Sequence, residues 1–308
     1  NTAAFEQIAQ ADGLYAKTLN GDAYSAEMKE QTIETIKKDL GQVDMVIYSI
    51  AAPRRTAPDG VTYKSVLKTT GEAYTNRTID LRSNQLTEAT IEPATQEEIN
   101  NTIKVMGGED WILWIKALKD AGVLADGAKT VAYSYIGPEL TYPIYKEGSI
   151  GQAKKDLYAS ADKIQEEVDG VEAYVSVNKA VVTQSSAAIP IVPLYLAILF
   201  KVMKEQNVQE GCIEQMYRMI HDRLCNGGEV VTDENRLIRM DDWEMEPKVQ
   251  EAVAAIWEKI DQDNLEEVTD LEGYWQEFYE IFGFCIDGVD YSADVDADVQ
   301  IPSIAPVE

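Results

Sequence analysis

Two tyrosines and a lysine lie close together in the stretch Ala132 to Leu157, AYSYIGPELTYPIYKEGSIGQAKKDL. Tyr145 and Lys154 are nine positions apart, and Tyr135 follows an apolar segment of strand length. A phenol has a pKa near 10, and a cation within about 4–6 Å lowers that pKa. A tyrosine activated in this way could stabilise a developing oxyanion and donate a proton.

The spacing of Tyr145 and Lys154 requires a break in the chain between them. On one straight helix they would point to opposite sides, about 13 Å apart along the axis. Gly148 favours a helix stop, and Ser149 with Gln152 has the pattern of a capping box that starts a new helix. We therefore expect a reversal at Gly148 that brings the phenol and the ammonium together. Isolated tyrosines at strand ends are more often packing residues with a hydrogen-bonded tip.

Apolar segments that alternate with helical patterns predict the fold. Continuous apolar runs at Val43–Pro53, Ala128–Gly137 and Val171–Thr183 are typical of strands covered on both faces, and we also expect a strand at Leu14–Asp22. An amphipathic helix is expected between the cap Ser25 and Gly41. This alternation predicts an α/β fold with a doubly wound parallel sheet of Rossmann type.

Insertions and extra helices interrupt this order. Residues 54–93 are rich in Thr and turn residues and predict a β-hairpin insertion. Residues 95–122 predict two helices separated by a Gly107-Gly108 break, the first opened by a capping box at Thr95 and Glu98. A second hairpin is expected at 229–240. The acidic segment 288–308 is expected to be a loosely attached tail.

Composition excludes several classes of function. The net charge of −27 over 308 residues argues against nucleic-acid binding, and any anionic ligand would need a local basic patch, for which Arg54 and Arg55 are the candidates. Three scattered cysteines and one histidine favour neither a disulfide scaffold nor a metal site, and indicate a reducing, cytoplasmic location. The most apolar run, 187–200, is too short to span a membrane and contains two prolines.

Several blocks of the sequence together resemble one enzyme family. VIYSIAAPRRT, TIKVMGGEDW, VAYSYIGPE, GSIGQAKKDL and VSVNKAVVTQSSAAIP occur in the order found in trans-2-enoyl-CoA reductases and V-type enoyl-ACP reductases. These enzymes are an enlarged branch of the short-chain dehydrogenase/reductase superfamily. The resemblance covers essentially the whole chain and implies one NAD-binding Rossmann-type catalytic domain over residues 1–308. By the same resemblance, the sequence is expected to lack the family's first βα units, with their Gly-rich turn.

The resemblance assigns roles to individual residues. Tyr145 matches the proton donor, Lys154 matches its partner that also holds the nicotinamide ribose, and Tyr135 matches the donor to the thioester carbonyl. The remaining matches are Asp22 and Ala23 at the adenine, Ile50 and Ala51 at the adenosine and ribose, Val181, Val182 and Thr183 at the nicotinamide and pyrophosphate, and Ile189 and Leu194 at the acyl chain.

The implied reaction is hydride transfer from NADH to the β-carbon of a trans-2-enoyl thioester in fatty acid synthesis. The substrate would be an enoyl-CoA or an enoyl-ACP, and the protein would be a monomer without a metal ion. Two alternatives remain open at this point: a ketone-reducing short-chain dehydrogenase, in which the tyrosine protonates the carbonyl oxygen, and a non-catalytic fragment.

Overall fold

A four-stranded sheet forms the centre of the computed structural model, which describes residues 1–296 and 299–304. The strand order is β1-β6-β7-β8, and every neighbouring pair is parallel. The strands are β1 (Val43–Tyr48), β6 (Leu124–Ser134), β7 (Val171–Val177) and β8 (Leu237–Arg239). The predicted α/β fold with a parallel, Rossmann-type sheet is confirmed.

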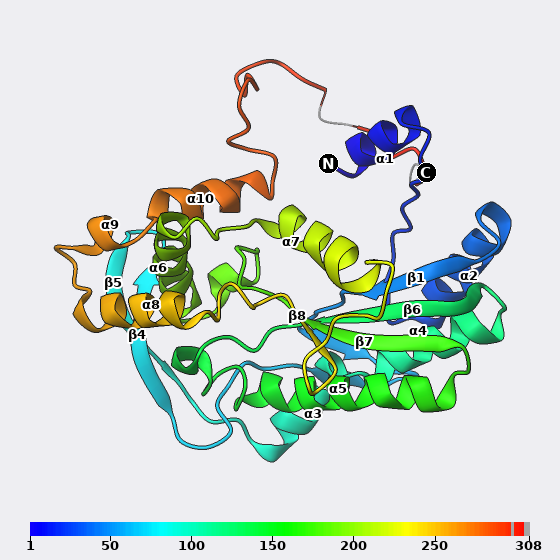
Figure 1. The fold of residues 1–308 in the computed structure, drawn as a ribbon, viewed down its shortest axis with the longest axis horizontal. Coiled ribbons are helices and arrows are strands. Elements are labelled where there is room, and N and C mark those ends of the chain that lie inside the picture. The colour runs from blue at the N-terminus through cyan, green and yellow to red at the C-terminus, as the bar shows by residue number, and fades with distance from the viewer. Residues whose placement is uncertain (297–298, 305–308) are drawn as a thin grey trace.

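Both faces of this sheet are covered, which explains its continuous apolar strands. Successive residues of β6 point to opposite sides. Ala132 packs in a cluster with α4 (Glu109–Asp120) and α5 (Ser149–Glu167), whereas Val131 packs with residues of η3 (Met219–Leu224). Figure 1 shows α3, α4 and α5 on one side of the sheet and α7 on the other.

A second apolar cluster lies beside the sheet and is built around α6 (Val192–Glu205), whose residues 192–200 are all buried. Helices α8 and α10 and strand β4 pack against α6 (Figure 1). The most apolar run of the sequence is therefore a buried helix. Within the described part of the chain, no helix is long and apolar enough to cross a membrane. The other helices are α1 (Thr2–Ala11), α2 (Ala26–Asp39), α3 (Gln96–Met106), α7 (Cys212–Arg218), α8 (Pro247–Lys259), α9 (Leu265–Val268) and α10 (Leu271–Glu280), with short turns η1 (Glu139–Thr141) and η2 (Ser186–Ala188).

The insertion at residues 54–93 contains two antiparallel strand pairs, where a single hairpin excursion was expected. Strand β2 (Arg54–Thr56) pairs with β3 (Thr62–Lys64), and β4 (Tyr74–Asp80) pairs with β5 (Gln85–Ile91). The longer pair buries Ile79 and Ile91 in the α6 cluster. The insertion therefore builds one wall of the apolar region next to the sheet.

Both predicted helix caps before the first long helices are present. Ser25 Oγ accepts a hydrogen bond from the Met28 backbone N–H at 3.1 Å at the start of α2. Thr95 and Glu98 form a reciprocal capping box at the start of α3. The predicted Gly107-Gly108 break separates α3 from α4.

Two predicted strand assignments are wrong. Residues 14–22 are extended but pair with no strand; instead the side chains of Tyr15 and Lys17 bond Asp39 at the end of α2. Residues 229–240 do turn at Asp233, but they form no hairpin, because Leu237–Arg239 pairs in parallel with β7. Burial of Leu237 and Ile238 against the sheet outweighs local pairing.

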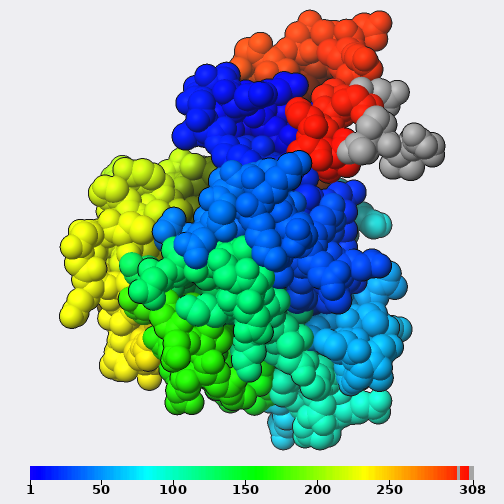
Figure 2. Space-filling view, turned by 90° about the vertical axis from the view of Figure 1, so that its right-hand side faces the viewer, coloured from blue at the N-terminus to red at the C-terminus, as the bar shows by residue number. Residues whose placement is uncertain are grey.

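The C-terminal segment returns to the beginning of the chain. The Ser303 backbone N–H donates to Glu6 Oε2 at 3.1 Å, and the Thr18 backbone N–H donates to Ser303 Oγ at 2.8 Å. Figure 2 shows this part of the tail beside the N-terminal residues. Loose attachment of the whole segment 288–308 stays a prediction, and residues 297–298 and 305–308 lie outside the described part of the chain.

Candidate active site

The predicted break between Tyr145 and Lys154 is present. Tyr145 lies in a turn after η1, where its backbone N–H donates to Thr141 O at 2.9 Å. Helix α5 then begins at Ser149, so Lys154 lies on its second turn. The predicted capping box is absent: Ser149 Oγ donates to Val66 O at 2.6 Å, and Gly148 is the N-cap without a side-chain bond.

Glycine is required where α5 folds back over this turn. A Cβ atom on Gly151 would lie 2.4 Å from the Tyr145 carbonyl oxygen and 2.1 Å from that of Lys146. Carbon atoms do not approach backbone oxygen this closely, so any side chain would push the turn away from the helix. Gly151 therefore helps to place the Tyr145 ring, a role that the sequence pattern did not reveal.

The structure brings the two candidate tyrosines into direct contact. The rings of Tyr135 and Tyr145 meet edge to face, with centroids 5.1 Å apart and an interplanar angle of 87°. Both rings pack against the α6 cluster. Burial raises the pKa of Tyr145, and burial together with the charge of Glu244 raises that of Tyr135. Both phenols are therefore neutral hydrogen-bond donors at neutral pH.

Lys154 contacts the end of the same strand, β6. Its Nζ donates to the carbonyl oxygen of Tyr133 at 3.2 Å, and burial lowers its pKa to about 8. Among the described residues, neither a hydrogen bond nor an ion pair joins Lys154 to Tyr145. The expectation that the lysine lowers the pKa of Tyr145 is wrong for this structure, because burial of the phenol raises it.

A buried carboxylate that sequence reasoning missed completes this region. Glu244 is fully buried, and its Oε1 accepts a hydrogen bond from the Tyr135 hydroxyl at 3.1 Å. It belongs to an acidic run, Asp241, Asp242 and Glu244, in which no spacing distinguishes one carboxylate from another. Only the fold shows which of them meets the tyrosines.

The residues expected around the adenosine lie at the carboxyl end of β1. Asp22 and Ala23 form a turn in which Asp22 Oδ1 accepts from the Tyr24 backbone N–H at 3.0 Å. Ile50 is half-buried and Ala51 exposed, directly after β1. A cavity of about 520 Å³ opens here, lined by Asp22, Tyr24, Ala52, Pro53, Arg54, Thr56 and Thr62. Of the four expected residues, only Asp22 lines this cavity; Ala23 and Ala51 are sequence neighbours of lining residues, and Ile50 lines a different pocket.

The two arginines expected to form a basic patch lie in different environments. Arg54 is exposed and lines this cavity, so it stays a candidate for contacting an anionic ligand. Arg55 is only 2% exposed and donates to Glu109 Oε2 at 2.8 Å and to Lys104 O at 2.7 Å. The prediction that Arg55 belongs to a surface patch is wrong, because the fold buries its guanidinium against the Lys104 carbonyl and Glu109.

The loop expected to line the nicotinamide follows β7. Val182 is buried in the α6 cluster, Val181 is half-buried, and Thr183 is exposed, with its backbone N–H bonded to Ser186 Oγ at 2.8 Å. Leu194 is fully buried in the same cluster, and Ile189 packs on it. The acyl candidates therefore share one apolar region with Tyr135 and Tyr145.

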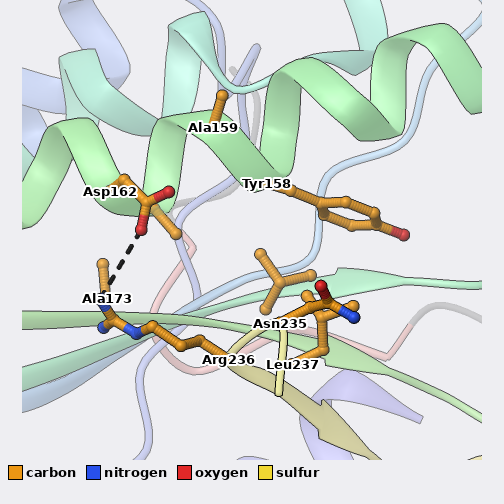
Figure 3. Close-up of a pocket in the computed structure, with 9 residues that line it drawn as sticks. Tyr158, Ala159, Asp162, Ala173, Asn235, Arg236 and Leu237 are labelled. Carbon is orange, nitrogen blue, oxygen red and sulfur yellow. Dashed lines mark ion pairs between the residues drawn. The ribbon is translucent and has the colours of Figure 1, made fainter. Parts of the chain in front are cut away.

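A different pocket lies between α5 and the β7–β8 edge of the sheet. Figure 3 shows Asp162 and Arg236 across it, joined by an ion pair of 3.6 Å. None of the residues expected to act on cofactor or substrate lines this pocket. The described residues also contain no group of three or more His, Cys, Asp or Glu that could hold a metal ion.

Comparison with known proteins agrees with this geometry. Residues 1–225 match the family model of the trans-2-enoyl-CoA reductase catalytic region, and residues 232–295 match the enoyl reductase FAD binding domain. Trans-2-enoyl-CoA reductase [NADH] of Ruminiclostridium cellulolyticum is 55% identical over 307 residues, which cover 99% of this chain and 78% of that protein. Enoyl-[acyl-carrier-protein] reductase [NADH] of Pseudomonas fluorescens is 56% identical over 303 residues, 98% of this chain and 76% of that one.

Solved structures show the same likeness. Treponema denticola trans-2-enoyl-CoA reductase in complex with NAD has a TM-score of 0.93 and 49% identity, and the match covers 96% of this chain and 74% of that one. The Clostridium acetobutulicum trans-2-enoyl-CoA reductase in complex with NADH has a TM-score of 0.92 and 45% identity, with coverage of 96% and 75%. With these matches over nearly its full length, the chain belongs to the trans-2-enoyl-CoA reductase family.

Proposed function

We propose that the protein is an NADH-dependent reductase of the carbon–carbon double bond of trans-2-enoyl thioesters, acting in fatty acid synthesis. The observation that carries the proposal is the pair of neutral phenols, Tyr135 and Tyr145, in ring contact beside an apolar cluster. They lie beyond the carboxyl end of β6, where open parallel sheets bind their ligands. Relatives that are 55% and 53% identical to this chain carry this activity in their names.

The environment of Lys154 fits a nicotinamide nucleotide. Its ammonium has three donor hydrogens but bonds only the Tyr133 carbonyl, and no carboxylate pairs with it among the described residues. A partly buried ammonium with spare donors suits the hydroxyls of a ribose. The turn at Asp22 and Ala23 and the exposed end of β1 at Ala51 would hold the adenosine half.

In this proposal, bound NADH supplies the hydride that adds to the β-carbon. Tyr135 and Tyr145 donate hydrogen bonds to the thioester oxygen, whose negative charge grows as the hydride arrives. Tyr145 is the proton donor, and protonation at the α-carbon completes the reduction. The cluster around Leu194 and Val182 holds the acyl chain away from water.

A flavin does not fit the segment that matches the FAD-binding family model. The pocket that α8 lines there carries Glu139, Glu251 and Glu258 and no lysine or arginine. A flavin dinucleotide brings a pyrophosphate, which requires positive charge or free backbone N–H groups. No step of the proposed reaction therefore passes through a flavin.

The proposal also covers the thioester carrier, the oligomeric state and the location of the protein. The relatives act on CoA or on acyl-carrier-protein thioesters by name, and exposed Arg54 offers a cation for a CoA phosphate. We favour the CoA ester. A net charge of −27 favours a protein that stays monomeric, and three free, exposed cysteines agree with a reducing cytoplasm.

Product analysis with crotonyl-CoA and with acetoacetyl-CoA tests this function. Oxidation of NADH with crotonyl-CoA, yielding butyryl-CoA, is the expected result. Turnover of acetoacetyl-CoA without turnover of crotonyl-CoA would instead identify a ketone reductase. Absence of turnover with both, while NADH still binds, would favour the non-catalytic alternative.

A further inference from the structure

Glu244 is a buried carboxylate at the junction of three elements, and the proposed reaction leaves it without a role. It is fully buried. Its Oε1 accepts hydrogen bonds from the hydroxyls of Tyr195, at 2.6 Å, and Tyr135, at 3.1 Å, while its Oε2 accepts from the backbone N–H of Ala180, at 2.7 Å. The carboxylate thus joins the end of β6, helix α6 and the loop after β7.

The charge of Glu244 is balanced without a direct ion pair. Three donors converge on its two oxygens, a pattern that suits the ionised form. Burial raises its pKa, and the bonds from Tyr195 and Ala180 and the charge of Lys179 oppose that rise. Lys179 is itself buried and bonds Ala180 O at 2.8 Å. The like charge of Asp241 adds to the rise in the pKa of Glu244.

The Tyr135 bond conflicts with the proposed chemistry, because a phenol has one proton to donate. While that proton is bonded to Glu244, Tyr135 cannot donate it to a thioester oxygen. The conflict can be resolved because Oε1 holds two hydroxyls. If Tyr135 turns its proton away, Tyr195 and the Ala180 N–H still satisfy the carboxylate, so no bare buried charge is left.

We infer that Glu244 is a positioning residue that binds the Tyr135 hydroxyl in the empty site and competes with the thioester oxygen for its proton. Substrate binding then exchanges one acceptor of Tyr135 for another while the ring stays in place against Tyr145. The inference rests on the proposed function, since it assumes that Tyr135 meets the thioester.

Two substitutions should move the KM for crotonyl-CoA in opposite directions. In Glu244→Gln the amide oxygen keeps the Ala180 N–H, which can only donate, and the NH₂ group faces the hydroxyls. Tyr135 then accepts and its proton is released toward the site, so the KM should fall about fivefold, the value of one hydrogen bond. In Tyr195→Phe the carboxylate keeps Tyr135 as its one hydroxyl partner and binds it more tightly, so the KM should rise by a similar factor.

The background variant Tyr135→Phe separates this role from a general structural effect. Without the Tyr135 hydroxyl, Glu244→Gln and Tyr195→Phe should each leave the KM within about twofold of the single Tyr135→Phe variant, because the coupling term is gone. Both measurements need only steady-state NADH oxidation, with the affinity for NADH measured separately by its fluorescence. Thermal unfolding of each variant reports any general loss of stability.

The inference is overturned if both variants change the KM in the same direction, or if their effects persist in the Tyr135→Phe background. Tyr195→Phe loses only one oxygen, so it tests the inference even if Glu244→Gln does not fold. Failure of the proposed function looks different: the unmodified protein would then not oxidise NADH with crotonyl-CoA at all.

Discussion

Two buried polar clusters near the candidate site each centre on a carboxylate that accepts a hydrogen bond from a tyrosine, but they differ in how the carboxylate charge is balanced. Under the nucleotide side, Lys29 pairs directly with Asp110 at 2.9 Å, and Asp110 also accepts from Tyr48 at 3.1 Å. Under the substrate side, Glu244 has no cation in direct contact and is held by Tyr135, Tyr195 and a backbone N–H.

The two clusters differ in whether the buried carboxylate can lose one partner without leaving an unbalanced charge. A buried ion pair that loses one partner leaves an unbalanced charge, so the Lys29–Asp110 cluster is suited to holding α2 against α4. A carboxylate that holds several neutral hydroxyls can release one of them at small cost. The substrate-side cluster can therefore take part in ligand exchange, whereas the nucleotide-side cluster is a fixed support.

The largest effect is expected from removing the hydroxyl of Tyr145. Tyr145→Phe should lower kcat by about 10³-fold, because the proton donor and one oxyanion donor disappear together. The affinity for NADH should stay within about twofold, since the ring packing in the α6 cluster remains. Steady-state NADH oxidation and a fluorescence titration measure the two quantities. Near-normal turnover would remove Tyr145 from the mechanism.

Lys154→Met should lower kcat/KM by about 10²-fold and weaken NADH binding, because the ammonium that we propose holds the nicotinamide ribose is lost. In the unmodified protein kcat/KM should fall as the pH rises through about 8, where the Lys154 pKa lies and the ammonium loses its charge. A pH-rate profile that is identical in both proteins above neutrality would contradict this assignment.

The lowered pKa of Lys154 also predicts how the free energy of unfolding changes with pH. The pKa of Lys154 is about 8 in the folded protein, against 10.5 for a free lysine, so the unfolded chain binds more protons between these values. The free energy of unfolding contributed by this group therefore rises with pH across that window. Denaturant titrations should show the rise in the unmodified protein relative to Lys154→Met, and a parallel dependence in both would contradict it.

On the fixed nucleotide side, the main effect should be on stability. Lys29→Met removes the direct partner of buried Asp110 and leaves only the longer 4.0 Å pair with Arg55, so it should lower the free energy of unfolding by about 3 kcal/mol. The matched control is Lys37→Met, whose exposed pair with Glu34 should contribute less than about 1 kcal/mol. If Lys29→Met changed the KM for crotonyl-CoA as much as Glu244→Gln does, the proposed difference between the two clusters would be wrong.

The smallest effect is expected at a helix cap away from both clusters. Thr95→Ala removes the capping box of α3 and should cost about 1 kcal/mol of stability without changing the KM for either substrate. Chemical denaturation measures it. A larger loss of stability, or a change in KM, would show that the start of α3 is coupled to the candidate site.

The sequence predicted the parts of the fold that local patterns determine. Apolar runs identified β1, β6 and β7, and cap residues identified the starts of α2 and α3. It also predicted the break before α5, because Gly148 is a local signal. The strand assigned to 14–22 failed because extended backbone can be fixed by side chains, here through Asp39, as well as by a sheet.

Long-range contacts account for what the sequence could not reveal. Arg55 looked like its neighbour Arg54 until the fold placed Glu109 beside it. Glu244 lies 109 positions from Tyr135, within a run of other acids, and no periodicity links the two. The sign of the Tyr145 pKa shift depends on burial by α6 and the insertion, which only tertiary packing determines.

A crystal structure of the protein with NAD and butyryl-CoA would test the central claim most directly. We predict that the thioester oxygen lies within hydrogen-bond distance of the hydroxyls of both Tyr135 and Tyr145, that Lys154 contacts the nicotinamide ribose, and that Glu244 retains Tyr195 and the Ala180 N–H. A thioester bound away from the two tyrosines, for example in the pocket between α5 and β8, would contradict it.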